Sequence, residues 1–142
     1  MKKFGLVTLG LLLVAAVMLC LPDSSAAQKA KGKTRPAMTK QLMKGIVNVN
    51  CGDLKKALEA EQADWDAITL KAALLNEAGY LLMEDGRCPD AEWAKAAKAL
   101  QQHSAAVLVK AEAKDLPGAQ AAFKELTGGS CAVCHKAHRP KA

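Results

Sequence analysis

The stretch WDAITLKAALLNEAGYLL, residues 65–82, carries apolar or small side chains in alternating steps of three and four. The stripe consists of Trp65, Ile68, Ala72, Leu75, Gly79 and Leu82. This spacing places all six on one face of an α-helix, and such a face is typically buried. We expect the helix to stop at Glu84-Asp85-Gly86, because glycine readily adopts the left-handed backbone that ends a helix.

Two stretches further along the chain repeat this pattern and predict two more helices. The first follows Pro89-Asp90, where the Asp90 carboxylate can cap the helix N-terminus, and it should end near Asp115. Its stripe consists of Trp93, Ala97, Leu100, Ser104, Val107 and Ala111. The second follows Pro117, with a stripe of Ala119, Phe123, Leu126, Ser130 and Val133. Gly128-Gly129 weakens this last helix by about 1 kcal/mol per glycine relative to alanine, so something else should secure its end.

The segment before residue 65 has a less regular apolar face. It contains Leu42, Met43, Ile46, Val47, Val49, Leu54, Ala57 and Leu58. We predict a helix over residues 37–60 with a kink or break at residues 50–52, where Asn50, Cys51 and Gly52 interrupt the face. No segment alternates with period two, so the predicted fold is an all-α, antiparallel four-helix bundle. Up-down connectivity then brings residues 131–139 close to residues 38–46.

The N-terminus has the features of a secretory signal peptide. Met1-Lys2-Lys3 precedes an apolar run that ends at Leu21, and small residues near Ala27 suit a signal peptidase. We therefore assign residues 1–27 to a signal peptide and expect an exported, periplasmic protein. The apolar run is also just long enough to span a bilayer, so an uncleaved membrane anchor is the alternative. Cys20 does not favour a lipoprotein, because the preceding Leu19 is bulky.

The rest of the chain is sized for one domain. Residues 28–36 form a predicted flexible leader with four positive charges, and residues 37–142 form the folded domain. The 142-residue chain has a formal net charge of +6. An excess of positive charge can steer an acidic partner or hold the protein near anionic lipid. The alternative is that residues 28–36 are only a solvated tail. We expect no nucleic-acid partner.

The chain ends in CAVCHKAHRPKA, where Cys131, Cys134 and His135 are spaced i, i+3, i+4 and so share one helix face. In an exported protein, CxxCH is the pattern of covalent c-type haem attachment. The two thiols bind the haem vinyl groups, and the histidine ligates the iron. We therefore predict one covalently attached haem c. The alternatives are a Cys131–Cys134 disulfide, and a zinc site that adds His138 but lacks a fourth ligand.

The ending KDLPGAQAAFKELTGGSCAVCHKAHR resembles the last helix of the class II cytochromes c, the cytochrome c′ family. PDAEW before the third helix and KQLMK in the first are similar to the patterns found there in that family. The resemblance covers residues 38–140 in helix order and is close only over residues 114–139. It implies that Cys131 and Cys134 attach the haem and that His135 is the proximal ligand. It also makes Arg139 the basic residue one turn beyond His135. The i, i+4 spacing lets Arg139 act on the imidazole or a haem propionate, and a solvated arginine is the alternative.

The resemblance leaves open which residue faces the other side of the iron. Low-spin members of the family use a methionine of the first helix and transfer electrons, and Met43 in QLMK matches that position. High-spin members have an apolar residue there, such as Leu42 or Ile46 here, and bind nitric oxide or carbon monoxide. A methionine thioether raises the reduction potential of haem iron. His103 and His138 are expected on the surface.

We therefore predict a monohaem electron-transfer cytochrome with His135 and Met43 on the iron, and a redox protein as its partner. No enzyme activity is expected, because no Ser/His/Asp set or carboxylate pair stands out. A gas-binding cytochrome c′ and a haem-free helical module held by disulfides are the alternatives. A homodimer is left open, and membrane association would involve only the N-terminal segment.

Cys51 and Cys88 lie outside the family pattern. A disulfide between them requires Cα atoms within about 7 Å. A straight bundle forbids that distance, whereas a break of the first helix at residues 50–52 permits it. The pairing of these two cysteines is therefore open.

Overall fold

The computed structural model describes residues 31–139, and the predicted signal peptide, residues 1–27, lies outside the described residues. Within the described part the chain is all-helical, with four packed rods and no strand. The first rod is α3 (Thr39–Leu42), the π-helical η1 (Met43–Val47) and α4 (Asn48–Glu59). The second is α5 (Trp65–Leu81) and the third α6 (Ala91–Glu112). The fourth is α7 (Leu116–Glu125), the π-helical η2 (Leu126–Ala132) and α8 (Val133–His138). The all-helical prediction is confirmed.

Aspartates begin the last three rods. The side chains of Asp64, Asp90 and Asp115 each accept a hydrogen bond from the backbone N–H three residues later, at 3.0, 2.8 and 2.9 Å. Each carboxylate thus satisfies an N–H that has no partner inside its helix. The cap at Asp90 is as predicted. Asp115, expected to end the third helix, instead caps the fourth rod, and α6 already ends at Glu112.

The predicted stripes of α5 and α6 form the core. Every stripe residue of the two helices except the half-buried Trp65 is buried. The indole Nε1 of Trp93 donates to the Leu82 carbonyl at 2.7 Å, which ties the start of α6 to the end of α5. The turn between the two helices is also as predicted, with Asp85 and Gly86 in the left-handed region at φ 59° and 77°.

The first rod is irregular at a different place from the one predicted. Helix α4 runs unbroken through residues 50–52, and the π-helical segment lies earlier, at Met43–Val47. The predicted break at Asn50-Cys51-Gly52 is therefore wrong. In a π-turn, backbone carbonyls no longer face the N–H groups that they would bond in an α-helix. The Asn50 side-chain amide supplies one such donor, to the Ile46 carbonyl at 2.8 Å.

A second π-helical segment, η2, contains Gly128-Gly129 and changes which residues of the fourth rod face inward. Beyond Leu126 the inward positions step by four, through Ser130 and Cys134 to His138. Two predictions are corrected by this shift. Val133 was expected in the stripe but is 39 % exposed, and His138 was expected on the surface but is only 8 % exposed.

The segment just before the first rod contacts the turn between α5 and α6. The backbone N–H groups of Thr34 and Arg35 donate to the two carboxylate oxygens of Asp85, at 2.9 and 3.0 Å. The fully buried Arg87 donates to the Ala37 carbonyl at 3.2 Å. Burial would raise the pKa of Asp85, but these hydrogen bonds and the Arg87 charge hold it below its usual value. Residues 34–37, predicted to lie in or beside a flexible leader, are thus bound to the fold.

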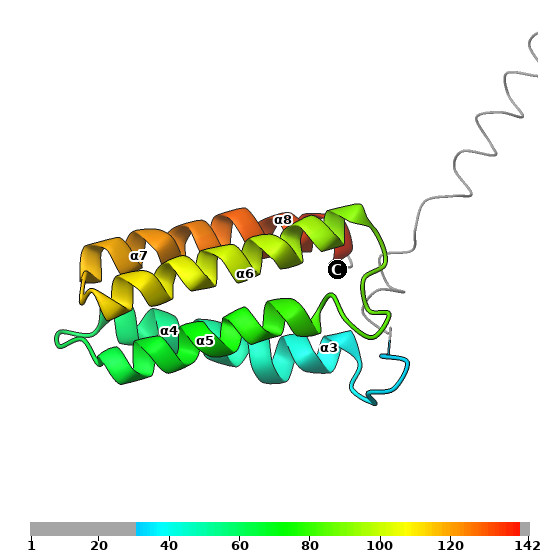
Figure 1. Ribbon diagram of the computed structural model, residues 1–142, viewed down its shortest axis with the longest axis horizontal. Helices are drawn as coiled ribbons and strands as arrows, with labels where there is room; N and C mark the ends of the chain where they lie inside the picture. Colours follow the sequence, from blue (N-terminus) through cyan, green and yellow to red (C-terminus); the bar gives the residue numbers. More distant parts are fainter. Residues whose placement is uncertain (1–30, 140–142) are drawn as a thin grey trace, which may run out of the picture.

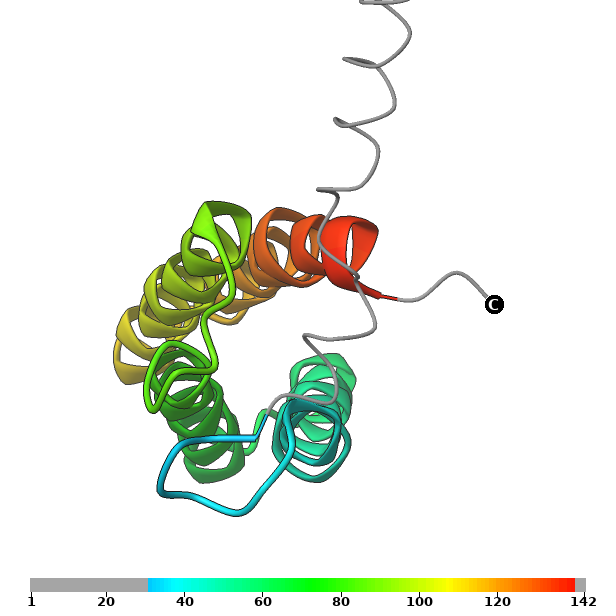
Figure 2. The same ribbon diagram turned by 90° about the vertical axis from the view of Figure 1, so that its right-hand side faces the viewer.

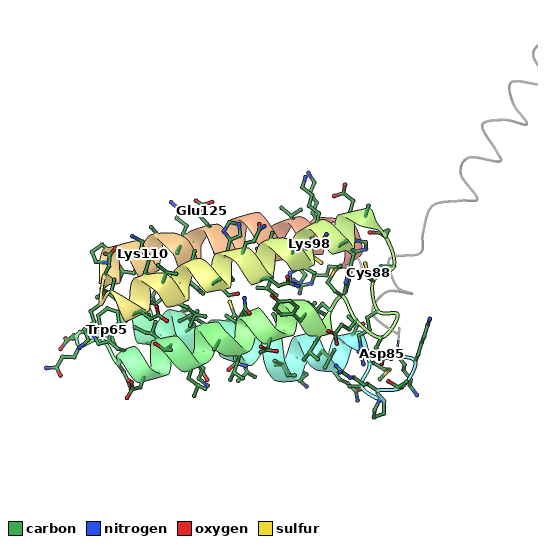
Figure 3. All side chains as sticks on the ribbon, viewed as in Figure 1. Trp65, Asp85, Cys88, Lys98, Lys110 and Glu125 are labelled. Carbon is green, nitrogen blue, oxygen red and sulfur yellow. The ribbon has the colours of Figure 1, made fainter. Side chains whose placement is uncertain are left out.

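Successive rods run in alternating directions, which brings the beginning of the first and the end of the last to the same end of the molecule (Figure 1). Asp85 and Cys88 lie at this end, whereas Trp65 and Lys110 lie at the opposite one (Figure 3). Seen from the end that carries α3 and α8, the rods follow one another around an arc in chain order (Figure 2). Within residues 31–139, no helix is long and apolar enough to span a membrane.

Candidate functional site

A cavity of about 430 Å³ lies between the first and last rods at the end that carries α3 and α8. At the other end these rods touch, and the Gln120 side chain donates to the Leu58 carbonyl at 2.7 Å. Residues from 40 to 51 form one wall and residues from 130 to 139 form the opposite one. The predicted proximity of the two segments is confirmed.

All five residues predicted from the sequence to bind haem line this one cavity. They are Met43, Cys131, Cys134, His135 and Arg139. Met43 comes from η1 in the first rod, whereas the other four come from η2, α8 and the residue after it. The structure therefore brings a thioether, two thiols, an imidazole and a guanidinium around one space, although Met43 lies more than 80 positions before the other four residues.

The floor of the cavity is apolar and is built by α6 and the end of α5. It consists of Leu82, Trp93, Ala96, Ala97 and Leu100. All five side chains are buried, and two are alanines, whose small size leaves room above them. The Trp93 ring is fixed by its hydrogen bond to Leu82. The cavity thus offers a rigid apolar surface of the kind that binds a largely apolar ligand.

Three exposed cationic side chains line the cavity. Lys40 and Lys44 come from the first rod and Arg139 follows the last, and all three side chains are exposed. Arg139 lies one turn beyond His135, as the i, i+4 spacing predicted, and both line the cavity. Burial, and then the charge of Arg139, lower the pKa of His135. Both effects favour the neutral imidazole, which is the form that can ligate a metal.

The π-helical η1 decides which residues of the first rod reach the cavity. Met43 and Val47 line it, whereas Leu42 and Ile46 do not. The alternative in which Leu42 or Ile46 lies over the iron is therefore not supported by the position of either residue. Val47 is the apolar residue that shares this wall with Met43.

Sequence reasoning missed a sixth chemically active side chain, Cys51. It lines the cavity from α4, and its thiol is in hydrogen-bonding contact with that of Cys131 on the opposite wall. The signal was present, because Met43, Val47 and Cys51 follow one another in steps of four. The sequence interpretation places Cys51 in a helix break, and a break there removes Cys51 from the inner face of the first rod.

The thiols around the cavity differ in acidity. The hydrogen bond from Cys131 lowers the pKa of Cys51 to about 7, against the opposing effect of burial. The same hydrogen bond, together with burial, raises the pKa of Cys131. Burial, and then the charge of Asp90, raise the pKa of Cys134 to about 11. Cys51 is therefore the member of this set that ionises most readily.

The four cysteines among residues 31–139 are all free thiols. Cys51 faces Cys131, whereas Cys88 donates a hydrogen bond to the Asp90 carbonyl at 3.4 Å. The structure thus contains neither the Cys51–Cys88 bridge nor the Cys131–Cys134 bridge considered from the sequence. The unbroken α4 explains the first outcome, because a bridge to Cys88 required that helix to break.

The remaining histidines lie outside the cavity. His138 packs edge-on against Trp93, with ring centroids 5.2 Å apart, and its Nε2 lies 3.4 Å from an Asp90 carboxylate oxygen. His103 is half-buried beside Gly129. Within the described residues, no three His, Cys, Asp or Glu side chains converge as metal ligands. The set of Cys131, Cys134 and His138 considered for zinc is therefore not assembled.

Comparisons with protein families, with curated proteins and with solved structures find no match to this chain.

Proposed function

We propose that the protein is an exported monohaem cytochrome that transfers electrons through one haem c held in this cavity. A single observation carries the proposal. The two thiols and the imidazole of CAVCH face an apolar cavity of about 430 Å³, and the Met43 thioether lies on the opposite wall. This donor set fits a c-type haem, which needs two thiols for its vinyl groups and an axial imidazole.

Cys131 and Cys134 would hold the haem by thioether bonds, and His135 would bind its iron as a neutral imidazole. These bonds also give the last rod the additional restraint that its glycine pair requires. When bound, the haem supplies a one-electron iron couple. The chain supplies the apolar floor formed by α6, which excludes water and keeps the ligands in fixed positions.

Met43 would be the second protein ligand of the iron, from the cavity wall formed by the first rod. Its sulfur comes from η1, so the position of this ligand depends on the π-helical register of the first rod. A soft thioether favours the reduced iron and raises the potential, which suits an electron carrier. As an iron ligand it would also exclude a gas molecule.

Lys40, Lys44 and Arg139 would pair with the haem carboxylates at the mouth. A haem is apolar over most of its area and anionic at one edge, and the cavity has the matching distribution of apolar floor and cationic rim. The remaining positive charge there would favour an acidic surface on the redox partner.

A five-coordinate, gas-binding cytochrome c′ is the second candidate. The observation in its favour is Val47, a nearly buried apolar residue on the same wall as Met43. If Val47 rather than Met43 lies over the iron, the sixth position stays open to nitric oxide or carbon monoxide.

Production with a c-type maturation system tests the proposal. The intact mass of the purified chain should rise by one haem that acid-acetone does not extract. Cys131→Ser or Cys134→Ser should each lose one of the two bonds. Cys88→Ser is the matched control and should retain both, because Cys88 does not line the cavity. A wild-type chain with no covalent haem under these conditions would contradict the proposal.

A further inference from the structure

Cys51 has no task in haem attachment, because a haem c has only two vinyl groups and CxxCH supplies both thiols. Yet Cys51 lines the same cavity and touches Cys131 across it, from the opposite rod. Both side chains are half-buried among apolar residues. The contact joins segments 80 positions apart in sequence, so it is a product of the fold and not of local spacing.

The environment of the pair suits thiol chemistry. The hydrogen bond with Cys131 lowers the pKa of Cys51 to about 7, which favours the Cys51 thiolate. The thiolate is the reactive form in disulfide exchange, and it reacts best when its pKa lies near the ambient pH. Cys88 is engaged elsewhere, with the Asp90 carbonyl.

We propose that Cys51 and Cys131 form a reversible disulfide in the haem-free protein, which links the first and last rods across the cavity. The consequence for maturation rests on the proposed function: while this disulfide is present, Cys131 has no thiol to offer a haem vinyl group. Oxidation of the Cys51–Cys131 pair would then block haem attachment, and reduction of the disulfide would restore it.

The chemistry balances with an external disulfide as oxidant, as expected in an exported compartment. The Cys51 thiolate attacks that disulfide, forms a mixed disulfide and releases one thiolate. The Cys131 thiol gives up its proton and attacks the Cys51 sulfur, which releases the second thiolate. Two protein thiols are thus oxidised to one disulfide, and the external disulfide is reduced to two thiols.

The direct test is to oxidise the full chain, purified haem-free, with glutathione disulfide and to map the linkages by tryptic mass spectrometry. Cleavage after Lys and Arg places Cys51 in residues 45–55, Cys88 in residues 88–95, and Cys131 with Cys134 in residues 125–136. Cys20 falls in a separate peptide, residues 4–29. The linkage between residues 45–55 and 125–136 should be at least about tenfold more abundant than any linkage through residues 88–95, because the two thiols are already in contact.

Two variants assign the sulfur atoms. Cys134→Ser should keep the linkage, because Cys131 remains, and Cys131→Ser should lose it. The same oxidation in denaturant is the control for folding and should scramble the pairing. Recovery of Cys51 as a free thiol with only Cys131 and Cys134 joined would overturn the proposal, as would a scrambled pattern without denaturant.

A second readout separates this proposal from the proposed function. The oxidised chain should fail to take up ferrous haem covalently, and uptake should return after phosphine reduction. If the linkage forms but haem is refused even after reduction, the proposed function fails and the disulfide stands. If haem is accepted but no linkage to Cys51 forms, the disulfide fails and the proposed function stands.

Discussion

At the scale of single residues, the sulfur opposite His135 decides what the cavity can do. Met43 and His135 lie on opposite walls of one space, so a metal between them would have a soft ligand on one side and an imidazole on the other. Such a pair leaves no open position for a gas. The distinction between an electron carrier and a gas-binding protein therefore depends on one side chain of η1.

Met43→Ala should change the iron from low-spin to high-spin and let it bind carbon monoxide, because the soft ligand is gone. The reduction potential should fall, since the thioether no longer stabilises the reduced iron. Absorption spectroscopy with and without carbon monoxide measures the first effect. Leu42→Ala is the matched control, because Leu42 does not line the cavity. An unchanged spin state in Met43→Ala would exclude Met43 as the ligand.

Asp85 is a second residue with a measurable role, because it accepts hydrogen bonds from residues before the first rod. Its pKa is lower in the folded chain than its ordinary value near 3.8. A depressed pKa contributes stability that is complete above the ordinary pKa and is lost as the pH falls through the folded-state value.

Asp85→Asn should therefore lower the thermal midpoint at pH 7, and the difference from wild type should shrink as the pH is lowered below about 4. Thermal unfolding followed by circular dichroism over this pH range measures it. Asp66→Asn, on an exposed residue of the α5 first turn, is a control. A difference that stays constant down to the lowest pH would contradict the assigned role of the Asp85 charge.

At the scale of elements, the contact between α5 and α6 is close because of one glycine. A Cβ on Gly79 would lie 2.6 Å from Gln101 Cγ and 3.1 Å from the Ala97 carbonyl oxygen. Gly52 is different, because an added Cβ there meets no atom within 4 Å. Both glycines lie inside helices, so they differ in packing and not in backbone conformation.

Gly79→Ala should destabilise the protein by about 1–3 kcal/mol, because the helix backbones must move apart. Gly52→Ala should instead stabilise it by about 0.5–1 kcal/mol, because alanine has the better helix propensity. Denaturant unfolding of the two variants gives both values. The account of this interface would be wrong if both substitutions changed stability in the same direction and by similar amounts.

The elements also show how far the sequence could predict this structure. The stripes of α5 and α6 follow an unbroken helical period, so their buried residues were identified correctly from spacing alone. The π-helical segments carry no such signal, because nothing in MKGIV or LTGGSCA specifies an extra residue per turn. For this reason Val133 and His138 were placed on the wrong faces. Cys51 was missed for a related cause, since its step-of-four spacing from Val47 was interrupted by polar neighbours.

At the scale of the whole molecule, the arc of rods is joined at one end and open at the other. The Gln120 hydrogen bond to Leu58 connects the first and last rods where they touch. Around the cavity, the helices of the first and last rods do not pack closely against each other. A covalently bound ligand that contacts both walls would therefore stabilise the molecule where its own side chains do least.

Haem-free protein should be less stable than matured protein by about several kcal/mol, because the attached haem would be buried against the apolar floor only in the folded chain. Thermal unfolding of the same chain produced with and without the maturation system makes the comparison. Equal midpoints would contradict a stabilising ligand in the cavity.

The measurement that tests the central claim most directly is the visible absorption spectrum of the matured protein, oxidised and reduced, with and without carbon monoxide. The account predicts a low-spin c-type haem spectrum that carbon monoxide does not alter. A protein without haem absorption would contradict the assignment of the cavity. A high-spin spectrum that shifts with the gas would contradict ligation by Met43 and favour the gas-binding alternative.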